Sequence, residues 1–473
     1  MMNKNAFVKA MTERIYDDCV AYIINEDGKT VSFVGLGADH SYLKFPRSIT
    51  YKSHEYIVKN ILCSIPPQFT IHVEFAIDSE VETIEMKAFA NCNVLSLSIP
   101  SSLIELKEGW CIGMDTLTQI SVDKNNPKYS TYDSKFIIGK SSIDQENYDL
   151  LVFARRDIKN ITIPSFIETI LPYSFGQCGS LREIKIPNDS SLKTIEKHAF
   201  HDSAIEIIII DSNEIELKEM CFSGANKLKK VIFNQKNPRY SIYDDKYIIE
   251  KSSNEQEIYD ILLFAFNDFE AAIIPDFIRR IASYSFYKHE KLKKIEFSDN
   301  SNIESIGEYA FDSTSIENLS IPAQIEQIGA SAFDNCISLK KVEVPINSKL
   351  KFIEKMAFWN SSIESFTIPS CVTRICKYSF NICKKLKKIT IPFDSKLERI
   401  EKYAFNGASI ESFIVPPHVK QIDEKVFAKC NKLQIIELDE KSELEYFDIK
   451  MFNENEEEKL ILIPDRLKNL LIL

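Results

Sequence analysis

The segment Leu386-Lys-Lys-Ile-Thr-Ile-Pro-Phe-Asp-Ser-Lys-Leu-Glu-Arg-Ile-Glu-Lys-Tyr-Ala-Phe405 decides the fold, because its pattern recurs along most of the chain. It runs from an Ile-x-Ile pair and a proline to a second apolar stretch that ends on an aromatic position. A long and a short step alternate strictly between successive positions of this kind: Phe286, Phe311, Phe333, Phe358, Phe380, Phe405, Phe427 and Phe452. Five earlier positions bring the series to 13: Phe89, Cys111, Phe175, Phe200 and Phe222. Such a fixed repeat predicts a solenoid, in which each turn packs only on its neighbours.

The Ile-x-Ile pair predicts a short strand in every turn. Side chains alternate in direction along a strand, so Ile389 and Ile391 should face inward and Thr390 outward. Pro392 cannot donate a hydrogen bond to a neighbouring strand, so it should end the strand and turn the chain. Because long and short turns alternate, the repeating unit is a pair of turns, as from Phe333 to Phe380.

Two intervals break the rhythm by the same amount. Cys111 to Phe175 and Phe222 to Phe286 are equal in length, and both are much longer than the other steps. Their inserts are copies at a constant offset, so that Asn126-Pro127 in the first matches Asn237-Pro238 in the second. Each holds two apolar runs, at 136–138 with 150–153 and at 247–249 with 261–264. We expect each insert to be a hairpin that protrudes from one turn.

The repeats resemble the leucine-rich repeats of the BspA-like, treponemal type. The runs Leu386 to Pro392 and Leu397 to Phe405 carry the resemblance, which covers roughly residues 56–464. It implies an α/β-type leucine-rich repeat solenoid, mostly β, right-handed and curved, with about 13 regular repeats and two hairpin inserts. Family members are typically surface proteins of bacteria and parasitic protists, and some bind extracellular matrix or other cells.

We expect three parts along the chain. Residues 1–60 should form an N-terminal cap, with a short helix over 6–17 and a hairpin of 21–25 and 30–34 around the Asp27-Gly28 turn. Residues 61–452 should form the leucine-rich repeat solenoid, with inserts near 124–160 and 235–271. Residues 453–473 should form a C-terminal cap.

Composition excludes several partners. The formal net charge of −11 argues against a nucleic-acid backbone as ligand, since that requires clustered Lys and Arg. The segment from Met1 to Val20 contains no apolar run typical of a signal peptide, and no segment is apolar enough to insert into a membrane. These absences favour a cytoplasmic location, whereas the family resemblance favours the cell surface.

No catalytic or metal-binding spacing stands out, and we expect neither enzyme activity nor a cofactor. We expect the seven histidines to be ordinary surface residues: His40, His54, His72, His198, His201, His289 and His418. Cys336, Cys383 and Cys430 recur two turns apart, so their sulfurs should lie about 10 Å apart. A disulfide needs Cα atoms within about 7 Å, so we expect buried, reduced thiols.

The outward strand positions of the concave face are the predicted protein-binding surface. Most are small or polar, but Ile209, Ile232 and Ile273 are apolar in three consecutive turns. The predicted binding residues are Lys185, Ile207, Ile209, Lys230, Ile232, Ile273 and Glu296. The alternative is that the second insert folds over this patch and buries it.

These observations predict a non-enzymatic protein-binding repeat protein. By resemblance it would be an adhesin or surface antigen whose ligand is a host or matrix protein. An intracellular protein-interaction scaffold is the alternative.

Overall fold

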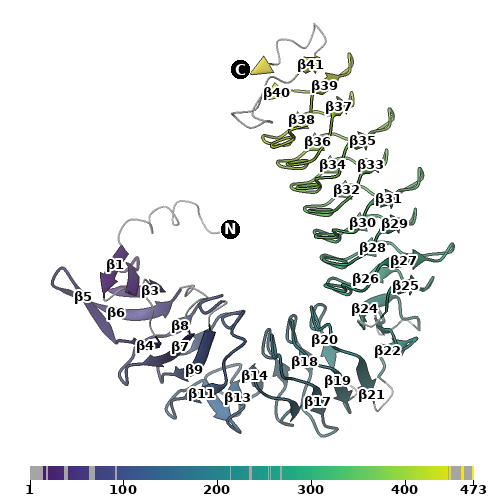
Figure 1. Cartoon of the computed structure of the whole chain (residues 1–473). Helices are drawn as coiled ribbons and strands as arrows, with labels where there is room; N and C mark the ends of the chain where they lie inside the picture. The colour runs from purple at the N-terminus through teal and green to yellow at the C-terminus, as the bar shows by residue number, and fades with distance from the viewer. Residues whose placement is uncertain are drawn as a thin grey trace. The chain divides into compact units, whose positions relative to one another are not determined.

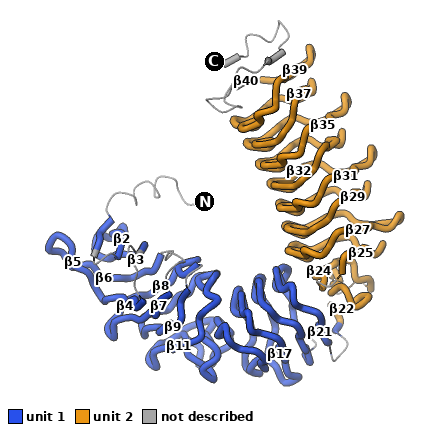
Figure 2. Tube along the Cα trace, in the orientation of Figure 1, with its two compact units in different colours: residues 1–237 blue, residues 238–473 orange. Residues whose placement is uncertain are grey.

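The computed structural model describes residues 14–17, 20–36, 41–62, 70–90, 93–212, 215–233, 237–253, 255, 257–266, 269–445, 447–448, 460–462 and 471–472. The chain divides into two compact units, Met1–Asn237 (unit 1) and Pro238–Leu473 (unit 2) (Figure 2). The described residues form a mostly β solenoid of about 17 turns and contain no helix. The predicted solenoid is therefore confirmed, with slightly more turns than the 13 aromatic positions indicated.

One turn of unit 2 shows how the repeat folds. Strand β37 (Ser412–Val415) buries Phe413 and Val415 and exposes Ser412 and Ile414, as alternation along a strand requires. Proline follows at once, and the chain returns through β38 (Gln421–Ile422), which buries Ile422. Each turn thus contributes one longer and one two-residue strand, and these strands stack into parallel sheets (Figure 1).

The described residues of unit 1 form four sheets. The first has the order β1 (Arg14–Asp17), β2 (Val20–Ile24), β3 (Thr30–Leu36), β6 (His54–Ile61), β8 (Thr83–Ile84) and β10 (Glu105–Leu106), with β5 (Ser48–Tyr51) paired to β6. The second has the order β11 (Gln119–Val122), β9 (Asn93–Ile99), β7 (Thr70–Phe75) and β4 (Tyr42–Phe45). The third has the order β12 (Tyr129–Tyr132), β13 (Phe136–Gly139), β14 (Leu150–Ala154), β16 (Thr169–Ile170), β18 (Thr194–Ile195) and β20 (Glu216–Leu217). The fourth has the order β15 (Asn160–Thr162), β17 (Glu183–Ile186), β19 (Ile207–Ile210) and β21 (Lys230–Phe233).

Unit 2 repeats this plan. One sheet has the order β22 (Tyr240–Tyr243), β23 (Tyr247–Glu250), β24 (Ile261–Ala265), β26 (Arg280–Ile281), β28 (Ser305–Ile306) and β30 (Gln327–Ile328). Its counterpart has the order β25 (Ala271–Ile274), β27 (Lys294–Phe297), β29 (Asn318–Ser320), β31 (Lys341–Glu343), β33 (Ser365–Thr367) and β35 (Lys388–Thr390). Further along are β32 (Phe352–Ile353), β34 (Arg374–Ile375), β36 (Arg399–Ile400) and β38 in one sheet, and β37, β39 (Ile435–Leu438) and β41 (Leu460–Leu462) in another. β40 (Phe447–Asp448) pairs with β42 (Leu471–Ile472).

The predicted N-terminal hairpin is confirmed, and the predicted helix is corrected. β2 and β3 pair antiparallel around a turn in which the Asp27 carboxylate accepts hydrogen bonds from the Lys29 and Thr30 amides, both 2.9 Å long. Residues 14–17 of the expected helix instead form β1, which pairs antiparallel with β2. The apolar residue of this strand that faces the core is Ile15, which is buried there. Residues 6–13 lie outside the described part of the chain, as does most of the predicted C-terminal cap. The boundaries at 60 and 453 stay predictions.

The inserts are not protruding hairpins. Each is a three-stranded antiparallel meander, β12–β13–β14 and β22–β23–β24, whose last strand pairs in parallel with β16 or β26. Ile137 and Leu151 in the first and Ile248 and Leu262 in the second have no exposed surface. The apolar runs are therefore core residues, and each insert forms the first three strands of a sheet that continues along the following turns.

The aromatic positions form buried columns. In unit 2, consecutive rings from Phe286 to Phe427 stack with centroids 4.8 to 5.8 Å apart, about the spacing of parallel strands. In unit 1, Phe200 stacks between Phe175 and Phe222 at 5.3 and 5.6 Å. Phe452 lies outside the described residues. The regular spacing in sequence therefore becomes a continuous stack of rings in unit 2 and a shorter stack, from Phe175 to Phe222, in unit 1.

Each aromatic position from Phe175 to Phe427 lies between two residues with left-handed backbone. Tyr378 (φ 62°) and Ile382 (φ 61°) flank Phe380, at two residues on either side. Such a conformation costs a non-glycine residue about 1–2 kcal/mol. Hydrogen bonds to the next turn offset this cost, since the amides of Phe380 and Ile382 donate to the carbonyls of Ala404 and Asn406 at 2.8 and 2.7 Å.

The cysteine series forms a hydrogen-bonded column. The thiols of Cys336, Cys383 and Cys430 are fully buried and donate to the carbonyl oxygens of Phe311, Phe358 and Phe405 at 3.2, 3.1 and 3.0 Å. Burial raises the pKa of the Cys336 and Cys383 thiols to about 12. Each of these cysteines therefore acts as a neutral, buried hydrogen-bond donor that ties its own turn to the one before.

Candidate functional site

Unit 1 brings five of the predicted binding residues together on one sheet. Lys185 on β17 lies in register with Ile209 on β19, which lies in register with Ile232 on β21. Ile207 is the register partner of Lys230 on the same two strands. The two lysines are exposed, whereas the three isoleucines are half-buried.

Unit 2 contains the remaining two predicted residues. Ile273 on β25 lies in register with Glu296 on β27. Ile273 is 61% exposed, the most open of the predicted apolar positions. Five of the seven predicted residues therefore belong to unit 1 and two to unit 2.

The second insert does not cover Ile273. Its strands β22 to β24 extend the sheet that contains β26, whereas Ile273 belongs to the sheet of β25 and β27. The insert reaches this position through the Tyr247 hydroxyl, which donates to the Ile273 carbonyl at 3.3 Å and leaves the Ile273 side chain open.

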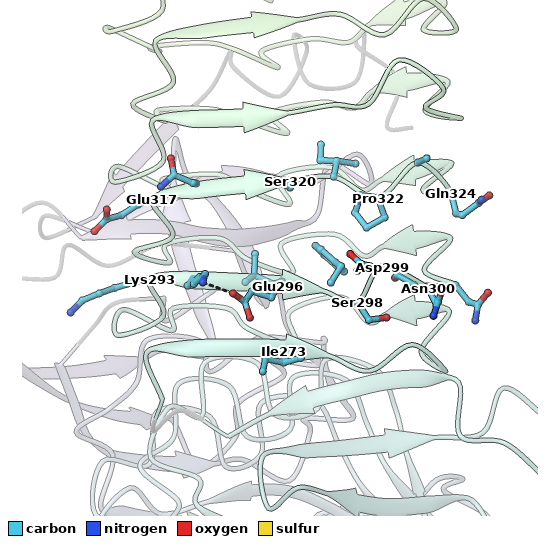
Figure 3. A pocket seen from close by; sticks show the side chains of 18 residues that line it. Ile273, Lys293, Glu296, Ser298, Asp299, Asn300, Glu317, Ser320, Pro322 and Gln324 are labelled. Atoms are coloured by element: carbon cyan, nitrogen blue, oxygen red, sulfur yellow. Dashed lines mark ion pairs between the residues drawn. The ribbon is translucent and has the colours of Figure 1, made fainter.

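A groove opens beside Ile273 on this sheet of unit 2. This sheet groove has a volume of about 1250 Å³ and is lined by Ile273, strands β27 and β29, and the turns at 298–302 and 322–324. Figure 3 shows Glu296 and Ser320 along its strands and Ser298, Asp299 and Asn300 at the turn beyond them. Its lining combines amide, hydroxyl and charged side chains with apolar residues, which are Ile273, Ile295, Phe297, Ile321, Pro322 and Ala323.

The groove lies where a long turn meets a short one. β25 and β27 pair over four residues, but β27 and β29 pair only at Lys294 and Asn318. The long turn after β27 has the sequence Ser-Asp-Asn-Ser-Asn at 298–302, whereas the equivalent turns begin with Pro345 and Pro392. The groove therefore combines divergent strands with a turn that offers hydrogen-bonding side chains.

Ion pairs hold the charged side chains along the floor. Lys294 pairs with Glu296 on the same strand, and Lys293 pairs with Glu270 at 3.0 Å. On the next strands, the Ser320 hydroxyl donates to Glu343 at 3.1 Å. Hydrogen bonds from Lys341 and then Ser320 lower the pKa of the Glu343 carboxyl. These pairs are exposed to solvent, so a partner can rearrange them at little cost.

The prediction that all histidines are ordinary surface residues was wrong for His289. It is only 1% exposed, and burial lowers its pKa to about 3, so the ring is neutral at physiological pH. It occupies the position three residues after Phe286, where Cys336 follows Phe333, and its ring packs edge-on against Phe286 at 5.5 Å. The repeat register, used for the cysteines, could have placed this histidine in the core.

His198 and His201 also differ from that prediction. Their Nδ1 atoms lie 2.8 and 3.0 Å from the hydroxyl of Ser223, and burial lowers the pKa of His198 to about 4. His201 Nε2 lies 3.6 Å from the Asp202 carboxylate. This resembles a nucleophile–base arrangement, but Ser223 is 1% exposed and cannot reach a substrate. The cluster is best explained as a polar link between neighbouring turns.

The described part of the chain contains no group of three His, Cys, Asp or Glu side chains placed to hold a metal ion. Among the same residues, no helix is long and apolar enough to cross a membrane.

The repeat pattern matches a known family over most of the chain. The description "BspA type Leucine rich repeat region" fits residues 69–137, 150–254, 256–387 and 351–471. The chain belongs to the BspA-type leucine-rich repeat family. Solved structures are also similar to this BspA-type chain. Its β solenoid fold agrees with membership of the family. No curated protein matches it.

A leucine-rich repeat protein from Eubacterium ventriosum is 16% identical, with a TM-score of 0.51, over 91% of this chain and 95% of that chain. This likeness shows the fold. A leucine-rich repeat protein from Bacteroides ovatus is 18% identical over 94% of this chain and 99% of that chain, with a TM-score of 0.40. A leucine rich cell surface protein from Faecalibacterium prausnitzii is 18% identical over 91% and 96%, with a TM-score of 0.39.

The residues beyond β27 were missed from the sequence. Asp299, Asn300 and Asn302 line the sheet groove, whereas strand alternation predicts binding positions on the strands alone. The missing proline at Ser298 was the available signal, because it marks a turn that differs from its counterparts.

Proposed function

We propose that this BspA-type protein is a non-enzymatic binding protein that holds a protein partner in the sheet groove of unit 2. The observation that carries the proposal is the 61% exposure of Ile273 at the edge of an open groove of about 1250 Å³. An exposed apolar side chain within a polar rim is typical of protein interaction sites. Glu296 lies beside Ile273 and would set the orientation of the partner.

The Lys185–Ile209–Ile232 group of unit 1, with Ile207 and Lys230, is a second proposed contact surface. Its isoleucines are half-buried, so it offers less apolar area than Ile273. It therefore ranks below the sheet groove.

The first form of the proposal is an adhesin or surface antigen, because members of the family are typically surface proteins. The partner would then be a host or matrix protein. The second form is an intracellular scaffold, which the buried free thiols favour, since such thiols persist in a reducing compartment.

Partner capture with matched variants tests the binding proposal. Ile273→Glu should abolish capture of the partner from host or native-cell extract, whereas the control Ile414→Glu should still capture the partner. Ile414 is 62% exposed and also occupies a central strand position, but it does not line the groove. Equal capture by both variants would remove the groove from the proposal.

Protease treatment of intact native cells separates the two forms. Loss of the full-length protein supports the surface form. Resistance of the full-length protein, with cleavage after lysis, supports the scaffold.

A further inference from the structure

A second groove in unit 2 lies where the second insert meets the two turns after it. This insert groove has a volume of about 700 Å³ and is lined by Glu257, Ile258, Asp260, Phe277, Arg279, Asn302 and Glu304. Asn302 also lines the sheet groove, so the two grooves adjoin. A partner segment leaving the sheet groove can therefore continue into the insert groove.

The apolar wall of the insert groove is open to solvent. Ile258 is 61% exposed, and Phe277 is half-buried. Tyr243, itself 39% exposed, packs edge-on against Phe277 with ring centroids 5.2 Å apart and holds that ring in place. An apolar side chain entering the groove would meet a preformed surface.

The charged lining is mainly acidic. Arg279 is the one cation among the lining residues, and it is already bound to Glu304, with its Nε and Nη2 donating to Oε1 at 3.1 and 2.6 Å. Asp260 is engaged within the insert, where it accepts from the amide and the hydroxyl of Ser252, both at 2.8 Å. Glu257 has no ion pair with any residue that the structure describes, and it faces the groove beside Ile258.

Unit 1 provides an internal control for these features. In the first insert, Tyr132 packs edge-on against Phe166 as Tyr243 does against Phe277. Asp149 accepts a hydrogen bond from the Ser141 amide at 2.9 Å, as Asp260 does from the Ser252 amide. At the position of Ile258, however, unit 1 has Asn147. The insert therefore folds without an apolar residue there, and the exposed Ile258 has no structural role that the first insert shares.

We propose that the insert groove binds a partner segment in which a Lys or Arg is flanked by apolar residues. The apolar side chain would lie on Ile258 and Phe277, and the cation would bind Glu257 and the second carboxylate oxygen of Glu304. A groove of this volume suits two or three side chains, not a whole domain. The inference rests on the proposed protein-binding function, and it specifies the chemistry of the partner at one end of the binding surface.

Synthetic peptides test this pairing directly. The probes are a fluorescent Gly-Ser-Gly-Leu-Arg-Leu-Gly-Ser-Gly peptide and its counterpart with Glu in place of Arg. The arginine peptide should bind saturably and more weakly as salt is added, and the glutamate peptide should not bind. Ile258→Asn, the residue found in unit 1, should weaken binding about tenfold, and Glu257→Lys should abolish it.

Matched variants in unit 1 control for nonspecific effects. Ile143→Asn removes an isoleucine that is 45% exposed in the first insert, and Glu146→Lys reverses the charge that corresponds to Glu257. Both should bind the arginine peptide as the unaltered protein does. Glu257→Gln provides a milder change if Glu257→Lys lowers the melting temperature, and it should still weaken binding.

Three outcomes would overturn the inference: equal binding of both peptides, no binding of either, or unchanged binding by Ile258→Asn. Its failure is separable from that of the proposed function. If Ile273→Glu abolishes partner capture while Ile258→Asn and Glu257→Lys leave it intact, the sheet groove stands and the insert groove does not.

Discussion

In the first insert Tyr132 packs edge-on against Phe166, and in the second Tyr243 packs in the same way against Phe277, each with ring centroids 5.2 Å apart. The strand pairings match as well, including a register shift after the second residue of β13 and of β23. The interiors differ. Phe136 and Gly139 in unit 1 correspond to Tyr247 and Glu250 in unit 2.

The second insert uses polar groups where the first uses packing alone. The Tyr247 hydroxyl donates to a carbonyl of β25, and the buried Glu250 pairs with Arg239 at 2.6 Å. In the first insert, Gly139 leaves no room for a side chain, since a Cβ there would lie only 2.9 Å from Val152. Because one backbone accepts both interiors, the shared features belong to the fold. The differences show where each unit is adapted.

The two tryptophans make this comparison measurable. Trp110 is buried in unit 1, and Trp359 lies in unit 2. In a chain with only one of them, fluorescence reports the unfolding of that unit.

The largest expected effect is the truncation of Phe136, which is 1% exposed. Phe136→Ala should lower the unfolding free energy of unit 1 by about 3–5 kcal/mol, because the cavity cannot close in a stacked core. Urea titration followed by Trp110 fluorescence measures it. Tyr132→Ala, at a 40% exposed ring, is the control and should cost about 1 kcal/mol. Equal losses would mean that the insert core is not packed as described.

Removing Arg156 should have the next largest effect. This buried guanidinium donates to the carbonyls of Met114 and Ser174, both at 3.0 Å, and lies over the Phe153 ring at 4.2 Å. Arg156→Met removes the guanidinium donor from the Met114 carbonyl and leaves the Ser174 carbonyl with the Ala154 amide alone, so it should cost unit 1 about 3 kcal/mol in urea unfolding. The urea unfolding of unit 2, followed by Trp359 fluorescence, should not change. A loss below about 1 kcal/mol would show that water replaces the guanidinium.

Disrupting the Arg239–Glu250 pair tests the polar interior of the second insert. Glu250→Gln should lower the stability of unit 2 by about 2 kcal/mol, because a charged hydrogen bond is replaced by a neutral one at a buried position. Lys246→Gln, which removes an exposed pair with Asp244, is the control and should be nearly neutral. Thermal melting followed by Trp359 fluorescence distinguishes the two.

The smallest effect is a pH dependence expected in unit 2. Burial raises the pKa of Asp312 to about 6 and, with the nearby Asp312 charge, that of Asp334 to about 7. A carboxyl with a raised pKa in the folded state stabilises that state at low pH, and this contribution disappears as pH rises through the folded pKa. Unit 2 should therefore lose about 1 kcal/mol or more between about pH 4 and pH 7. Asp334→Asn should flatten this slope, and an unchanged slope would contradict the assignment.

The sequence predicted the column of rings well, because spacing alone determines which residues stack. It predicted the inserts only in part. The run Tyr129-Ser-Thr-Tyr132 is too polar to read as a strand, so β12 was missed, and the apolar runs were assigned to a protrusion instead of the sheet. Whether a strand extends an existing sheet depends on contacts distant in sequence.

The strand residues of the candidate site could be predicted from the sequence, but the groove beside them could not. Ile273 and Glu296 follow from strand alternation, which is a local rule. The groove beside them depends on how far β27 and β29 diverge, and that depends on the lengths of two successive turns acting together. The insert groove exists because the meander folds back into the sheet. The protruding hairpin expected from the sequence would not have formed this groove.

The column of buried thiols also provides a way to follow how unit 2 unfolds. Cys336, Cys383 and Cys430 are spaced at every second turn and have no exposed surface, so an alkylating reagent reaches each one only when its own turn has come apart. In a stack where each turn depends on its neighbours, opening spreads from an end. The order in which the three cysteines acquire label would therefore identify the end from which this unit unravels.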